Sequence, residues 1–184
     1  MFLTRNLFLT FALFQIYQTV AQIVQFGTSG NDELYGVVAD SSGNFVITGT
    51  TSGSFTGSTN SGNLDIFVRK FNISGAVAFT KQFGSSQNDY AGSIVFDSAG
   101  GIFVAGYTEG SLPGYTLRGE LDGILRKYRS DGSVTFTKQM DGGFRSYDLI
   151  YLVSHISLPL SHNLYYYIPY PVPQAIVRII LAQS

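Results

Sequence analysis

Six aspartates are the first candidates for chemistry, because paired carboxylates a few ångströms apart can hydrolyse glycosidic bonds. They form three pairs separated by the same interval of 57 positions: Asp32 and Asp89, Asp40 and Asp97, Asp65 and Asp122. Recurrence at a fixed interval is explained more simply by turns and strand ends that every copy of a repeated unit needs. We therefore predict no catalytic residue among these acids.

Calcium binding is the alternative chemistry for the same acids. The candidate ligands are Asp32, Asp40, Asp89 and Asp97. The stretch from Asp40 to Asn44 superficially resembles an oxygen-ligand loop, but it lacks the alternating acids and the distal glutamate of an EF-hand. Glu33 would add carboxylate oxygens, although the second copy has Tyr90 in its place. We favour turn formation over ion binding and predict no cofactor.

Nucleophilic catalysis has little support in this sequence. A serine nucleophile needs a histidine beside it, and the chain has only His155 and His162, both far from the repeated segments. The absence of cysteine excludes disulfides and thiolate metal sites. We therefore expect a protein that is not an enzyme.

Two further sets of residues could form binding surfaces. Tyr107, Tyr115 and Phe55 could form an aromatic ligand surface, but packing in a core or loop is the favoured interpretation. Arg69-Lys70 recurs as Arg126-Lys127, and neighbours in a strand point to opposite faces, so no single basic patch forms. We expect these charges to be solvated or to protect a sheet edge.

Composition excludes some partners. The 184 residues have a net charge of −1 at pH 7, which gives no basic field for nucleic acid or anionic lipid. Only 12% of residues are charged and 21 are glycine, as expected for strands joined by tight turns.

The N-terminus predicts export. Arg5 precedes the apolar run from Leu7 to Ile16, and Thr19-Val20-Ala21 places small residues before a cleavage point. We predict a signal peptide over residues 1–21, a secreted or extracellular protein, and no membrane span in the mature chain. Asn72-Ile73-Ser74 is then a candidate N-glycosylation site in a eukaryotic host, within a predicted turn.

The strongest pattern is an ungapped repeat of 57 residues, in which residues 25–81 align with 82–138 at about 26 identical positions. The first copy predicts four strands, at Leu34–Asp40, Asn44–Thr50, Asp65–Phe71 and Ala76–Phe83. Short turns at 41–43 and 72–75 join the first and last pairs. The fold class is therefore all-β.

A tandem four-stranded antiparallel unit of this length is typical of a β-propeller blade, because one such sheet needs a neighbour on each face. We predict two full blades and part of a third, which do not close a ring. Residues 22–26 align with 79–83, so we also expect a lone outer strand before the first blade.

The segments QFGTSGND, VVADSSGNFVITGTTSGSF, NSGNLDIFVRKFNISG and AFTKQFG resemble consecutive parts of the SBBP-type β-propeller repeat. The resemblance covers residues 22 to about 143. It implies blades on secreted or cell-surface proteins, often in arrays, and it brings no catalytic residues.

The pattern ends after a third copy begins at residue 139. Residues 144–184 form a divergent apolar, tyrosine- and proline-rich tail, interpreted equally well as a cap or as unrelated sequence. Its prolines tell against a membrane anchor.

These features predict a non-catalytic extracellular binding or scaffold module. The expected partners are further blades, from self-association or another chain, and an extracellular protein or glycan. The alternatives are a fragment of a propeller-fold glycan hydrolase or lyase without its catalytic blades, and a truncated non-functional gene product.

Overall fold

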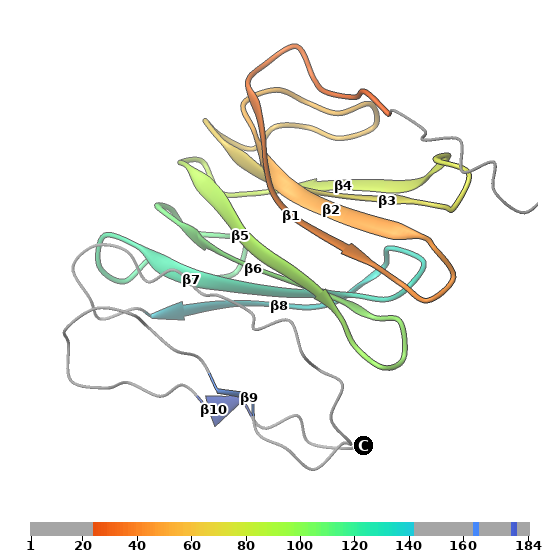
Figure 1. The fold of residues 1–184 in the computed structure, drawn as a ribbon. Helices are drawn as coiled ribbons and strands as arrows, with labels where there is room; N and C mark the ends of the chain where they lie inside the picture. The colour runs from red at the N-terminus through yellow and green to blue at the C-terminus, as the bar shows by residue number, and fades with distance from the viewer. Residues whose placement is uncertain (1–23, 142–163, 166–177, 180–184) are drawn as a thin grey trace, which may run out of the picture.

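A computed structural model describes residues 24–141, 164–165 and 178–179 of the chain. These residues contain no helix. They form two four-stranded antiparallel sheets and one short two-stranded ladder, as Figure 1 shows. The all-β prediction is confirmed, and the two sheets do not close a ring.

The first sheet has the strand order β1-β2-β3-β4, and each strand pairs with the next along the chain. Its strands are β1 (Asp32–Ala39), β2 (Phe45–Thr51), β3 (Asp65–Phe71) and β4 (Val77–Phe83). The predicted strands agree with these bounds to within two residues. A tight hairpin turn joins β1 to β2. Gly43 adopts φ 80° there, a conformation that favours glycine, and its amide donates to the Asp40 carbonyl at 3.1 Å.

The second sheet repeats the first. Its strands are β5 (Asp89–Phe96), β6 (Ile102–Thr108), β7 (Asp122–Tyr128) and β8 (Val134–Asp141), in the order β5-β6-β7-β8. The β-bulges also recur 57 residues apart. The bulge between Leu34 and Gly36 in β1 is equivalent to the bulge between Ala91 and Ser93 in β5. The same sequence pattern therefore produces the same sheet twice.

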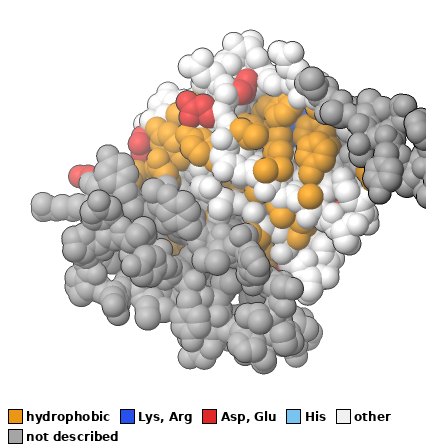
Figure 2. Space-filling model, viewed as in Figure 1, with side chains coloured by type: hydrophobic (Ala, Val, Ile, Leu, Met, Phe, Trp, Pro, Cys, Tyr) orange, Lys and Arg blue, Asp and Glu red, His pale blue; other side chains and the backbone are white. Residues whose placement is uncertain are grey.

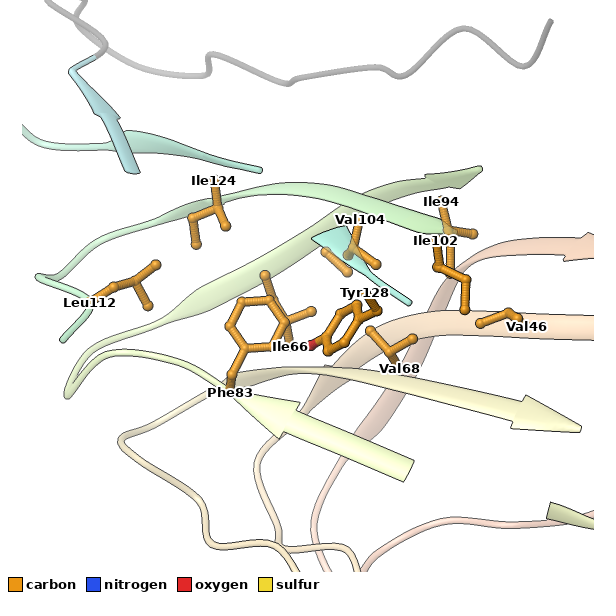
Figure 3. Packing of buried hydrophobic residues seen from close by; sticks show 11 residues of the cluster. Val46, Ile66, Val68, Phe83, Ile94, Ile102, Val104, Leu112, Ile124 and Tyr128 are labelled. Carbon is orange, nitrogen blue, oxygen red and sulfur yellow. The ribbon is translucent and has the colours of Figure 1, made fainter. Parts of the chain in front are cut away.

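The two sheets pack face to face around one apolar core (Figure 1, Figure 3). The first sheet contributes Val46, Ile66, Val68 and Phe83, whereas the second contributes Ala91, Ile94, Ile102, Val104, Leu112, Ile124 and Tyr128. Figure 3 shows labelled side chains from both sheets pointing toward one another. The core thus lies between two repeats, and each sheet depends on the other for burial.

Each sheet also carries apolar side chains on its other face. The first sheet gathers Ile47, Phe55, Phe67 and Phe71 there, and the second gathers Val95, Phe103, Ala105 and Leu125. We call the face of each sheet that carries Ile47 or its equivalent Val104 the leading face. The opposite face, with Val46 or Phe103, is the trailing face. The core joins the trailing face of the first sheet to the leading face of the second.

The expected lone strand before the first sheet is not confirmed, because residues 24–28 form no strand. Residues 22–23, the predicted signal peptide and nearly all of the predicted third unit and tail lie outside the described residues. The tail contributes only β9 (Leu164–Tyr165) and β10 (Arg178–Ile179), which pair antiparallel.

Replacing a core side chain should destabilise both sheets together. We expect Ile124→Ala to lower the free energy of unfolding by about 2–5 kcal/mol, because Ile124 is fully buried and its loss leaves a cavity. Urea unfolding followed by circular dichroism measures this loss. Ile73→Ala is the matched control, since Ile73 is 74% exposed and should cost no more than about 0.5 kcal/mol. Equal losses in both variants would contradict a core between the sheets.

Candidate functional site

The structure places Asp40 and Asp97 inside equivalent hairpin turns. Asp40 Oδ1 accepts hydrogen bonds from the amides of Ser42 and Asn44, both at 2.9 Å. Asp97 Oδ1 accepts from the amide of Gly101 at 2.6 Å, and Asp97 Oδ2 pairs with Lys127 Nζ at 2.8 Å. The hydrogen bond from the Asn44 side chain lowers the pKa of Asp40. Both carboxylates therefore stabilise the hairpin turns in which they lie.

Asp32 and Asp89 have a second shared role, at the start of the first strand of each sheet. The amide of Thr28 donates to Asp32 Oδ2 at 2.7 Å, and the amide of Ser85 donates to Asp89 Oδ2 at 2.6 Å. The four calcium candidates are therefore bound to their own loops. Within the described residues, no group of three or more acids, histidines or cysteines could hold a metal ion.

Asp65 and Asp89 meet at the junction between the sheets, on either side of Gly84. A Cβ atom added to Gly84 would lie 2.6 Å from Asp89 Oδ2 and closer still to Asp65 Oδ1, so only glycine fits there. Asp65 Oδ2 accepts from the amide of Ser61 at 2.9 Å and from Gln82 Nε2 at 3.1 Å. The Oδ1 atoms of both aspartates are buried and have no hydrogen-bond partner.

This pair carries the largest carboxylate pKa shift of the described residues. Burial raises the pKa of Asp89 to about 6, the hydrogen bonds from Thr108 and Ser85 oppose the rise, and the charge of Asp65 adds to it. Burial also raises the pKa of Asp65. The sequence showed these acids only as members of separate pairs, because their contact joins two different repeats.

The arginines do not match the expectation of solvated or edge-protecting charge. Arg126 reaches across the junction and lies 4.1 Å from the ring centroid of Phe83, while Arg69 lies 5.1 Å from that of Phe26. Desolvation lowers the pKa of Arg69. The opposite facing of each Arg-Lys pair is confirmed, because Lys127 lies over Phe103 on the trailing face.

Phe26 explains how the first sheet begins. It aligns with Phe83, the last residue of β4, and both rings lie beneath the equivalent arginine of the sheet that follows. Phe26 also packs against Phe67 and Phe71 of the leading face. The segment before β1 thus fills the outer part of that face without forming a strand.

The three aromatic residues Phe55, Tyr107 and Tyr115 do not form one ligand surface, and packing, the favoured interpretation, holds for Phe55 and Tyr115. Phe55 is 4% exposed and packs on Phe67, with ring centroids 5.0 Å apart. The Tyr115 hydroxyl donates a hydrogen bond to the Thr137 carbonyl. Only Tyr107 takes part in a different arrangement, stacked on Tyr90 with centroids 4.7 Å apart and planes 20° from parallel.

The stacked pair belongs to a tyrosine–glutamate cluster that the sequence did not reveal: Glu33, Tyr35, Tyr90, Tyr107 and Glu109. The Tyr35 hydroxyl donates to Glu33 Oε2 at 2.6 Å, and Asn88 Nδ2 donates to Glu109 Oε2 at 2.6 Å. The hydrogen bond to Glu33 and desolvation raise the pKa of Tyr35 to about 12, and the charges of Glu33, Tyr107 and Tyr90 add to it.

This cluster departs from the repeat. Glu33 stands where the second copy has Tyr90, Thr50 where it has Tyr107, and Ser52 where it has Glu109. A blade therefore does not need these residues for its fold. A position-by-position comparison of the two copies was the one signal that could have identified them, but it does not show that they are neighbours.

The other residues singled out in the sequence are the glycosylation candidate Asn72 and the two histidines. Asn72 lies in the exposed turn between β3 and β4, where its Oδ1 accepts hydrogen bonds from the amides of Ser74 and Ala76. His155 and His162 lie outside the described residues. No described helix is long and apolar enough to cross a membrane.

Stability should fall as pH rises through the raised pKa of Asp89. The folded state holds the Asp89 proton up to about pH 6, whereas an unfolded aspartate has lost it above about pH 4. We therefore expect the free energy of unfolding to be about 1 kcal/mol higher at pH 5 than at pH 7 from this group. Urea titrations at both pH values measure the difference.

Asp89→Asn should remove most of this difference, leaving the smaller part that comes from Asp65. Asp131→Asn is the matched control, because hydrogen bonds from Ser133 lower the pKa of Asp131 and place its titration below this window. A pH dependence that survives Asp89→Asn unchanged would contradict the assignment.

The family comparison agrees with this geometry. Residues 78–113 match the family model SBBP, described as a beta-propeller repeat. The matched segment runs from β4 through the junction into the loop after β6. No curated protein matches the chain. The resemblance seen in the sequence is thus confirmed over residues 78–113, which match the SBBP beta-propeller repeat.

Proposed function

We propose that this protein is a secreted, non-catalytic binding or scaffold module made of propeller-type blades, which associates with further blades. One observation carries the proposal. Leu34 and Val37 of β1 are 56% and 65% exposed, whereas their equivalents in β5, Ala91 and Ile94, are 3% and 6% exposed within the core. The leading face of the first sheet therefore has the apolar residues of a junction face, but no other sheet of the described residues packs against β1 there.

The trailing face of the second sheet has the matching chemistry. Its Val95, Phe103 and Leu125 are the equivalents of Val38, Val46 and Val68, which meet the second sheet at the observed junction. A blade from a second copy, or from another chain, would thus present a surface of the kind that already packs against Ala91 and Ile94. Figure 2 shows hydrophobic side chains at the surface of the described residues in this view.

The repeated acids support a non-catalytic role, because each of them holds the loop or strand end of its own blade. Asp65 and Asp122 make the same contact as one another, accepting from Gln82 and Gln139 at 3.1 and 2.8 Å. A binding or scaffold role needs only surfaces and stable blades, and both come from the repeat itself.

Association can be tested with the full chain by size-exclusion chromatography with light scattering. We expect the wild type to form assemblies larger than a monomer, and Val37→Lys to shift them to a monomer by placing a charge on the docking face. Val77→Lys is the matched control, since Val77 is 44% exposed on β4 at the opposite edge of the sheet. A wild type that stays a cooperatively folding monomer at all concentrations would defeat the proposal.

Export can be tested through Asn72. In a secreting eukaryotic cell we expect the full chain to appear in the medium with a glycan on Asn72, seen as a mobility shift that a glycosidase removes. Asn72→Gln should be secreted without the shift, and deletion of residues 2–21 should retain the chain in the cytosol without a glycan. Secretion of the deleted form would contradict the predicted signal peptide.

A further inference from the structure

The tyrosine–glutamate cluster lies where strands of both sheets meet. Glu33 and Tyr35 come from β1, Tyr90 comes from β5, Tyr107 from β6, and Glu109 follows β6 directly. Tyr90 and Tyr107 face each other across adjacent strands in register, which produces their parallel stack. Because two blades contribute, the cluster exists only when the junction is formed.

The cluster is accessible to solvent. Tyr35 is 46% exposed and Glu33 is also exposed, while Tyr90, Tyr107 and Glu109 are each partly buried. The rings are held rather than free to rotate, because Tyr35 is tied to Glu33 and Tyr90 is stacked on Tyr107. A surface of fixed aromatic rings loses little side-chain entropy when a ligand binds.

The charge of the cluster selects the kind of ligand. The side chains that donate hydrogen bonds to its two carboxylates are the neutral donors Tyr35 and Asn88. The charges of Glu109 and Glu33 contribute, after desolvation, to a raised pKa of Tyr90, so both carboxylates act on the same ring. Aromatic faces beside carboxylates attract an organic cation.

We propose that the tyrosine–glutamate cluster binds an organic cation, a guanidinium or ammonium group, with Tyr90 and Tyr107 as the aromatic platform and Glu33 and Glu109 as the counter-charges. Such a group can be the arginine or lysine side chain of a polypeptide, or the alkylated ammonium of a small molecule. This inference deepens the proposed binding role, but it does not require association with further blades.

The first experiment is a ¹H–¹⁵N NMR titration of the full chain with three probes. The probes are an acetylated Gly-Arg-Gly amide, the same tripeptide with neutral citrulline in place of arginine, and tetramethylammonium chloride. We expect the arginine peptide to shift the amide signals of β1, β5 and β6 near the cluster, with at least fivefold weaker binding at 500 mM than at 50 mM NaCl. The citrulline peptide should cause no saturable shift.

The relative affinities of the arginine peptide and tetramethylammonium distinguish a polypeptide side chain from a small alkylated cation. A neutral oligosaccharide is the competing class of ligand, since stacked tyrosines can also bind sugar rings. Saturable binding of an oligosaccharide at this cluster, or equal binding of the arginine and citrulline peptides, would overturn the proposal.

Variants separate the roles of ring and charge. We expect Tyr90→Ala and Glu33→Gln each to weaken binding of the arginine peptide at least fivefold. Glu120→Gln is the control for net charge, because Glu120 is exposed in the loop before β7 and should leave the affinity unchanged. Dispersed spectra show that each variant is folded, and wild-type affinity in both Tyr90→Ala and Glu33→Gln would refute the site.

Tyr107 follows Phe103 and Ala105 at alternate positions of β6, and Tyr90 is its cross-strand partner, so both rings lie on the trailing face of the second sheet, where a docked blade would cover them. Cation binding and blade association are therefore separated with a monomeric variant. Val37 lies on the leading face and is not a member of the cluster. The monomeric Val37→Lys variant should therefore still bind the arginine peptide. A wild type that stays a monomer but binds the arginine peptide would reject the proposed assembly and keep the site. A wild type that associates, while the monomeric Val37→Lys variant does not bind the peptide, would reject the site and keep the assembly.

Discussion

A four-stranded sheet with apolar side chains on both faces cannot bury itself, and the rest of this structure follows from that constraint. Alternation along β2 and β3 sends Val46 and Val68 to one face and Ile47 and Phe67 to the other. Packing a second, equivalent sheet against one face buries the apolar side chains of that face only. The solution is heterologous, because the trailing face of one repeat meets the leading face of the next, and it leaves one face of each kind at the ends.

The junction is more than apolar contact, since polar groups set its geometry. Gly84 allows Asp65 and Asp89 to approach on either side of the backbone, and Arg126 covers the ring of Phe83. Buried groups of this kind require defined positions, because a carboxylate without a partner is costly in a medium of low dielectric constant. A raised pKa of Asp89 is the consequence, and it links the stability of the junction to pH.

The repeat also separates residues that the blade needs from residues that it does not need. Positions that recur, such as Asp40 and Asp97, accept the same backbone hydrogen bond in both copies, which explains why each copy has them. Positions that differ, such as Glu33 and Tyr90, are free of that requirement. Their gathering with Tyr107 beside the junction makes the tyrosine–glutamate cluster the described surface where binding specificity can arise without loss of the blade.

The sequence by itself determined the strands, turns and tandem arrangement, because these depend on local alternation and on glycine and aspartate at turns. The period of 57 then predicted a second sheet equal to the first. Tertiary structure alone decided which residues of different repeats meet: Asp65 with Asp89, Arg126 with Phe83, and Glu33 and Tyr35 with Tyr90. A repeat period orders residues along the chain but carries no distance between faces, so only packing of the two sheets could reveal these contacts.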